Sequence, residues 1–197
     1  MRRAVGSALA LVALAGCVKA PQPPPASVHT VAVLPPLNRT HDELLISGGT
    51  VLEKYVFHTT RVTVPDVLAA EARTLLDRQG YTLVAPELVE AATSGRAPAS
   101  AGEAAALARA HDLPGDVLYI DLRQWEPNLT YGPSAIIVAL HMELIDPATG
   151  TALWSADHPA RPVATPGTIN FADAYWVAAR EVVRQMLAPF GTRRADR

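Results

Sequence analysis

The sequence predicts one α/β domain in which helices pack on a mixed β-sheet that ends in an antiparallel meander and a C-terminal helix. Three observations support this fold class. Early in the chain, apolar strand-like runs alternate with segments of helical periodicity, the order typical of strands joined by helices. From residue 116 onward, three strand-like segments follow one another, which indicates a meander. Residues 171–187 then return to helical periodicity.

The first elements predict the parallel part of the sheet. The apolar run His29–Leu34, which Pro35 and Pro36 stop, is typical of a strand buried on both faces. Pro65 opens a helix, and Gly80 stands where a helix C′ glycine belongs. The buried stripe of this helix is predicted to be Leu68, Ala72, Leu75 and Leu76, with Glu71, Arg73, Asp77 and Arg78 largely outside it.

The segments between these elements have weaker patterns. Residues 38–49 are polar and loop-like, and residues 50–64 are rich enough in Val, Tyr, Phe and Thr for one or two strands. Glu53 shares its strand face with Val51, Tyr55 and Phe57, which counts against a membrane-spanning hairpin. Residues 81–84 predict a strand and residues 86–92 a short helix. Ser100 and Glu103 form a capping box for a helix that ends at Ala110.

The meander has the clearest periodicity. Asp116–Trp125 predicts a strand with Leu118, Ile120 and Leu122 on one face, and Ala135–Asp146 has an unbroken apolar face at period two. Residues 146–150 supply a turn, residues 152–156 the hairpin partner, and a proline-rich loop follows. The inner face of the last helix is predicted to be Val182, Val183, Met186 and Leu187.

The N-terminus has the features of an export signal. Arg2 and Arg3 precede a short apolar run, and small residues lead to Cys17, the only cysteine. Leu14–Cys17 resembles a bacterial lipobox, which implies cleavage between Gly16 and Cys17 and acylation (palmitate) of Cys17. The alternative is an ordinary secretory signal with a chance cysteine. The run is shorter than the roughly 20 residues that span a bilayer, so a retained transmembrane helix is not expected.

These features predict four parts of the chain. Residues 1–16 are the signal peptide, and residues 17–29 are the acylated cysteine with a proline-rich, extended tether. Residues 30–190 form the α/β domain, which we expect in the periplasm. Residues 191–197 form a polar tail.

Charge and motifs exclude several function classes. Without Arg2 and Arg3, 15 of the 17 basic residues remain against 19 acidic ones, with no basic cluster for nucleic acid. The six histidines are scattered without ligand spacing, and an acylated Cys17 leaves no thiol, so neither a metal nor another cofactor is expected. The chain has no Gly-x-Ser-x-Gly, phosphate-loop or His-Glu-x-x-His motif.

Three segments resemble periplasmic lipoproteins whose domain is similar to the N-terminal domain of the Tol translocation protein. They are Val31–Thr40, Leu107–Ile120 and Leu144–Trp154. Small outer-membrane lipoproteins of unassigned function are the most similar, and the curli-secretion channel lipoprotein, the exopolysaccharide-secretion lipoprotein and the lipoprotein activators of penicillin-binding proteins are more distantly so. Val18 after the cysteine resembles the pattern sorted to the outer membrane. Unlike the curli channel, this chain lacks clean membrane-inserting strands.

The resemblance implies a non-enzymatic accessory or assembly factor for secretion or envelope biogenesis. Its partners would be the membrane, through the lipid on Cys17, and envelope proteins or further copies of itself. A peptidoglycan- or peptidoglycan-synthase-binding module is an alternative. The candidate contact residues are Asn38, Arg39, His58, Arg61, Tyr175 and Trp176, although Asn38 also suits a turn and one of Tyr175 and Trp176 is expected in the core.

A second alternative is a hydrolase. His141 and Glu143 share one strand face, and Asp121, Arg123 and Trp125 share a face of the preceding strand. If the strands pair in the right register, Asp121, His141 and Glu143 come together as acids and an imidazole. Ordinary cross-strand ion pairs on an outer sheet face are the competing interpretation, and it is the one we favour.

Overall fold

A six-stranded mixed sheet organises the computed structural model, which describes residues 23–46, 62–128, 130 and 132–191. The strands follow the spatial order β3-β1-β4-β5-β6, and β2 pairs with β4 beyond β1. Their bounds are β1 (Thr30–Val33), β2 (Leu37–Asn38), β3 (Thr82–Leu83), β4 (Asp116–Asn128), β5 (Gly132–Asp146) and β6 (Thr151–Ala164). The described helices are α2 (Val64–Arg78), α3 (Pro86–Thr93), α4 (Ala101–Ala110) and α5 (Phe171–Met186).

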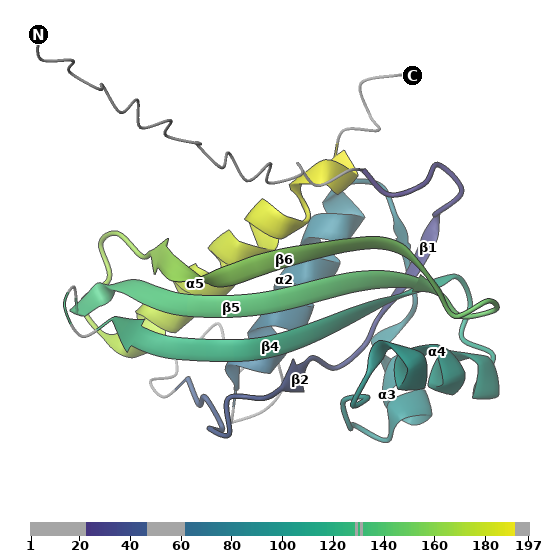
Figure 1. The fold of residues 1–197 in the computed structure, drawn as a ribbon, viewed down its shortest axis with the longest axis horizontal. Coiled ribbons are helices and arrows are strands. Elements are labelled where there is room, and N and C mark those ends of the chain that lie inside the picture. Colours follow the sequence, from purple (N-terminus) through teal and green to yellow (C-terminus); the bar gives the residue numbers. More distant parts are fainter. Residues whose placement is uncertain (1–22, 47–61, 129, 131, 192–197) are drawn as a thin grey trace, which may run out of the picture.

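Strand direction divides the sheet into two parts. Strand β1 pairs in parallel with β3 and β4, and β2 also pairs in parallel with β4. Strands β4, β5 and β6 form a long antiparallel meander, shown in front in Figure 1. The predicted α/β fold with a terminal meander and a closing helix is therefore confirmed.

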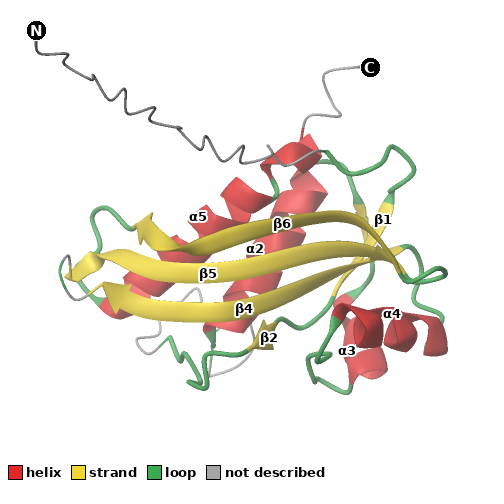
Figure 2. Ribbon diagram, in the orientation of Figure 1, coloured by secondary structure: helices red, strands yellow, loops and turns green. Residues whose placement is uncertain are grey.

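The helices cover the two faces of the sheet unequally. Helices α2 and α5 lie side by side behind the sheet (Figure 2) and bury its larger core cluster. Helices α3 and α4 pack a smaller cluster against the opposite face, at the β1 end. Val31 and Val33 belong to the first cluster and Ala32 and Leu34 to the second, so β1 is buried on both faces, as its continuous apolar run predicts.

The helix termini follow from local sequence signals. Thr63 caps α2: its backbone N–H donates to Asp66 Oδ2 at 2.8 Å, and its hydroxyl accepts from the Asp66 N–H. Gly80, at φ +88°, ends this helix as predicted. At α4 the predicted capping box is half formed, because Ser100 accepts from the Glu103 N–H but the Glu103 carboxylate accepts from Ala99.

Two predictions about the loops are wrong. The proline-rich segment after residue 156 is not a loop, because β6 continues to Ala164. It tolerates its prolines because β6 is an edge strand, paired only with β5, and Pro159 lies in a bulge between His158 and Arg161. Within the predicted 38–49 loop, Asn38 belongs to β2, where Leu37 and Asn38 pair with Asp121 and Leu122.

Other predicted segments lie wholly or partly outside the described residues. These are the signal peptide with Gly16 and Cys17, the first half of the tether, most of the 50–64 strand segment, and the end of the polar tail. Val64, at the end of that strand segment, instead begins α2. None of the described helices is long and apolar enough to cross a membrane.

Candidate functional site

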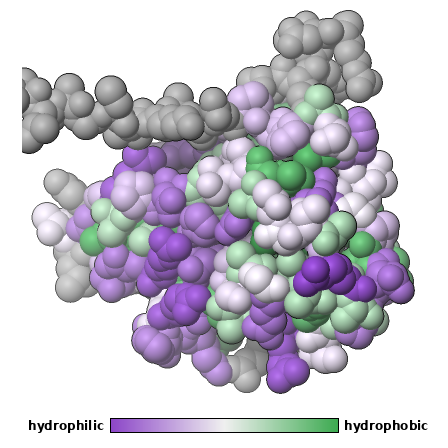
Figure 3. Space-filling model, turned by 45° about the vertical axis from the view of Figure 1, so that its right-hand side comes forward, coloured by the Kyte–Doolittle hydropathy of each residue, from purple (hydrophilic) through white to green (hydrophobic). Residues whose placement is uncertain are grey.

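A network of charged side chains occupies the face of the meander opposite α2 and α5. On this face the described helices α3 and α4 reach only the region around Val117, Tyr119 and Ile145. Beyond it lies what we call the charged sheet face, which consists of Arg39, Asp121, Arg123, His141, Glu143 and Asp157. Figure 3, a view turned by 45° from that of Figure 1, shows hydrophilic side chains over much of the visible surface and hydrophobic ones in smaller patches.

Asp121 is the centre of this network. Its side chain is only 8% exposed, and its two oxygens accept from different arginines. Arg39 Nε donates to Oδ1 at 2.7 Å, and Arg123 Nε donates to Oδ2 at 3.0 Å. The hydrogen bond to Asp121 raises the pKa of Arg39, and burial raises the pKa of the neighbouring Tyr119. Both arginines are about half exposed and present the outer part of the network to solvent.

The network continues across β5 and β6. Asp157 Oδ1 lies 3.3 Å from Arg123 Nη1 and 2.9 Å from His141 Nδ1. The other ring nitrogen of His141 lies 3.6 Å from Glu143 Oε2. Since Asp121 and His141 are direct cross-strand partners, the sheet does bring together the residues of the predicted polar cluster.

Trp125 does not share this face, contrary to the prediction. A bulge between Leu122 and Gln124 shifts the alternation of β4 by one residue. Trp125 is therefore buried in the core at 2% exposure, where its ring meets that of Tyr175 edge-to-face at 6.0 Å.

The contacts of Asp121 limit what the cluster can do chemically. A general base needs a lone pair within hydrogen-bond reach of the proton that it removes. Both Asp121 oxygens already accept from guanidinium groups, which hold the carboxylate in the sheet. The geometry thus favours the cross-strand ion-pair interpretation over a hydrolytic centre.

The other candidate contact residues have structural roles as well. Asn38 forms a turn in which its Oδ1 accepts from the Thr40 N–H at 3.0 Å, as the sequence suggests. Arg39 Nη2 also donates to the Ala99 carbonyl at 3.1 Å. Tyr175 and Trp176 are both partly buried against the core, rather than one of them alone. His58 and Arg61 lie outside the described residues.

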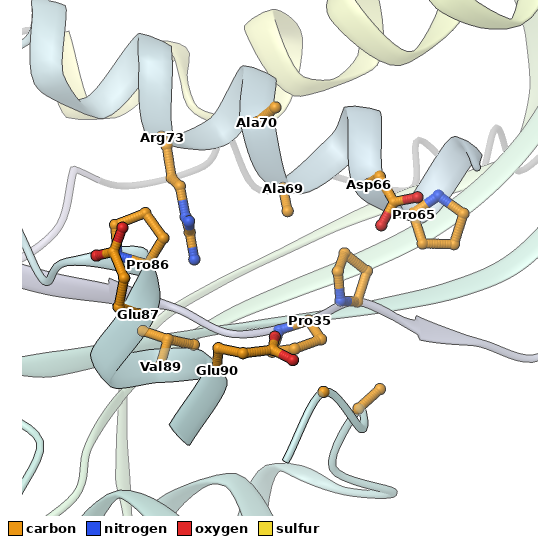
Figure 4. Close-up of a pocket in the computed structure, with 13 residues that line it drawn as sticks. Pro35, Pro65, Asp66, Ala69, Ala70, Arg73, Pro86, Glu87, Val89 and Glu90 are labelled. Carbon is orange, nitrogen blue, oxygen red and sulfur yellow. The ribbon is translucent and has the colours of Figure 1, made fainter. Parts of the chain in front are cut away.

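Sequence reasoning missed a groove of about 660 Å³ between α2 and α3, which we call the α2–α3 groove. Figure 4 shows Arg73 pointing from α2 toward Pro86 and Glu87 at the start of α3. Periodicity places Arg73 largely outside the buried stripe of its helix. Four prolines also line the groove, and their spacing along the chain gives no sign that they meet: Pro35, Pro36, Pro65 and Pro86. Among the described residues, no group of His, Cys, Asp and Glu side chains is arranged to hold a metal ion.

Arg73 is held firmly in this groove. Its Nη2 donates to the Val33 carbonyl at 2.9 Å, at the end of β1. Burial lowers the pKa of the guanidinium, and the nearby Glu87 carboxylate opposes that shift. The α2–α3 groove therefore contains a partly desolvated cation that is fixed by the backbone and faces a glutamate.

Comparisons with known proteins give distant structural likenesses. No protein-family model matches the chain, and no curated protein matches it. Among solved structures, a PelC dodecamer from Paraburkholderia phytofirmans is 18% identical with a TM-score of 0.48, over 88% of this chain and 95% of that one. Lipoprotein GNA1162 from Neisseria meningitidis is 21% identical with a TM-score of 0.45, over 68% and 79% of the two chains. The LpoB C-terminal domain from Salmonella enterica is 20% identical with a TM-score of 0.42, over 70% and 83%.

One of these solved structures is described as a lipoprotein, which is the class of protein that the sequence resemblance names. Identities near 20% with TM-scores below 0.5 assign no function to this chain.

Proposed function

We propose that this protein is an outer-membrane lipoprotein, anchored through an acylated Cys17, whose α/β domain in the periplasm binds partner proteins. In this role it is a non-enzymatic accessory or assembly factor of a secretion or envelope-biogenesis system. The lipobox resemblance supports the anchor, Val18 supports the outer-membrane location, and the charged sheet face supports the binding role.

The observation that supports partner binding is the pair of hydrogen bonds that Asp121 accepts from Arg39 and Arg123. The two arginines that donate to Asp121 through Nε have side chains that are about half exposed. Arginine is enriched in protein interfaces, and charged groups fixed in place give specificity and fast association. The charged sheet face therefore suits docking of a complementary protein surface better than proton transfer.

The anchor would strengthen such contacts without adding any. Acyl chains contribute about 0.8 kcal/mol per buried methylene, and several chains together hold a protein on a membrane. Confinement near the membrane raises the effective concentration of the domain for partners in the same layer.

A matched pair of charge reversals tests the role of the charged sheet face. Asp157, at 63% side-chain exposure, contacts both Arg123 and His141 on the charged sheet face. Asp77 is exposed on α2 and forms no ion pair among the described residues. The lipidated protein would be purified from membranes in mild detergent, and the proteins that accompany it would be identified and quantified. We expect Asp157→Arg to lose partners that Asp77→Arg retains, with both variants folded by circular dichroism.

Two outcomes would contradict the proposal. Equal recovery of partners by wild type and Asp157→Arg would remove the charged sheet face from the binding role. A hydrolytic activity that is lost in His141→Asn and Glu143→Gln, while the fold is retained, would favour the enzyme alternative.

A further inference from the structure

We propose that the α2–α3 groove binds an extended segment of a partner protein that carries a lysine or arginine side chain. The inference rests on the proposed function only in taking the ligand to be a protein. It uses a different surface from the charged sheet face, and different residues carry it.

The shape of the groove suits a chain segment. Its volume of about 660 Å³ falls within the range of ligand-binding clefts. Four of its lining residues are prolines: Pro35, Pro36, Pro65 and Pro86. They come from three parts of the fold, the end of β1 and the starts of α2 and α3, and they form rigid apolar walls with the small side chains of Ala69 and Ala70.

The hydrogen-bonding character of the lining is strongly one-sided. Prolines have no backbone N–H, and among the lining side chains Arg73 alone carries donor groups. The lining also contains three carboxylates, on Asp66, Glu87 and Glu90. With one guanidinium against three carboxylates, the groove is rich in acceptors and net negative. A complementary ligand must bring donors and positive charge.

The three carboxylates differ in whether they already accept hydrogen bonds within the protein. Asp66 Oδ2 accepts from both the backbone and the hydroxyl of Thr63, so it belongs to the helix cap. Glu87 faces Arg73 without a hydrogen bond among the described residues. Glu90 has no side-chain hydrogen bond or ion pair there either, and its carboxylate lies beside Gly95. Glu87 and Glu90 are therefore the groups that a ligand cation would meet.

Lysine and arginine match both halves of this lining. Their aliphatic stems can pack along apolar walls while the charged ends reach the carboxylates. A single side chain fills only part of the groove, which leaves room for the residues on either side of it. An extended polypeptide segment therefore fits the groove better than a small free amine does.

Peptide titration of the purified full-length protein, followed by amide chemical shifts in NMR, tests this inference. The probe is the acetylated and amidated peptide Ala-Ala-Lys-Ala-Ala, compared with its norleucine counterpart and with n-butylamine. The groove variant is Glu87→Gln with Glu90→Gln. The control for loss of a surface carboxylate is Glu126→Gln, at an exposed position of β4 outside the groove.

We expect saturable binding of the lysine peptide, with shifts at Arg73 and Val89. Loss of charge-assisted contacts should weaken binding about tenfold for the norleucine peptide and for the groove variant. The Glu126→Gln control should bind like wild type. Higher salt should weaken the lysine peptide more than the norleucine peptide.

Several results would overturn the inference. These are equal binding of the two peptides, no saturable binding at millimolar peptide, and shifts confined to the charged sheet face. Binding of n-butylamine as tight as that of the peptide would overturn the assignment to an extended segment. Since this titration needs neither the anchor nor a native partner, its outcome is independent of the Asp157→Arg experiment.

Discussion

Asp121→Asn should destabilise the protein by about 2–3 kcal/mol. The substitution keeps the side-chain shape but replaces one acceptor oxygen with an NH₂ group that faces an arginine donor. A hydrogen bond to a charged group contributes about 1.5–3 kcal/mol when buried, and an unsatisfied buried donor costs about 1–3 kcal/mol. The two contributions together would reach about 2.5–6 kcal/mol. Because Arg39 and Arg123 are half exposed, solvent screens both pairs, so we expect a loss around the lower end of that range.

Urea denaturation followed by circular dichroism measures this free energy for the wild type and the variant in the same detergent. In a separate thermal melt, the melting temperature should fall by about 4–12 °C, because a domain of this size loses about 2–4 °C per kcal/mol. Asp157→Asn is the control, since its carboxylate is 63% exposed and should contribute less than about 0.5 kcal/mol. An Asp121→Asn variant within 0.5 kcal/mol of wild type, or a control that is equally destabilising, would refute the view of Asp121 as the centre of the network.

Three further predictions concern pH, the core and the anchor. The His158 side chain is buried, at 3% exposure, and burial lowers the pKa of its imidazole. The ring Nε2 accepts from Arg161 Nε, and Nδ1 faces the Val138 carbonyl. The unfolded state then binds more protons near and below the ordinary histidine pKa of about 6.5, so the free energy of unfolding should fall as pH drops from about 7 to 5.5. Urea midpoints across this range should show a smaller slope for His158→Gln, and an unchanged slope would contradict the assignment. Trp125→Ala should cost about 3–5 kcal/mol by urea denaturation, whereas a loss below 1 kcal/mol would contradict its core position. Cys17→Ala should move the protein from the membrane fraction to the soluble one on fractionation, and continued membrane attachment would contradict the lipid anchor.

Local patterns predicted most elements because each depends on side chains close in sequence. The first strand, the helix opened by Pro65 and the period-two face of β5 all appear where periodicity places them. The helix cap at Thr63 was missed, since the residues before it were read as strand. Pro159 and Pro162 suggested a loop because proline usually interrupts strands, and only the edge position of β6 makes them compatible with pairing.

The candidate sites depended on contacts between distant parts of the chain. The cross-strand pairing of Asp121 with His141 requires a register that side-chain parity does not specify, and the bulge after Leu122 reverses the face of Trp125. The contact of Arg39 with Asp121 joins residues 82 positions apart. None of these relationships has a local signal.

Local sequence patterns are therefore enough to predict the fold class, the order of most elements and a lipid-anchored N-terminus. These follow from periodicity, capping and turn residues, which act within a few positions of each other. By contrast, the folded structure is needed to see that Asp121 accepts from two arginines and that four prolines meet Arg73, Glu87 and Glu90 in one groove. Strand register and helix packing bring these groups together, and both arise from burial of the whole core rather than from any one segment.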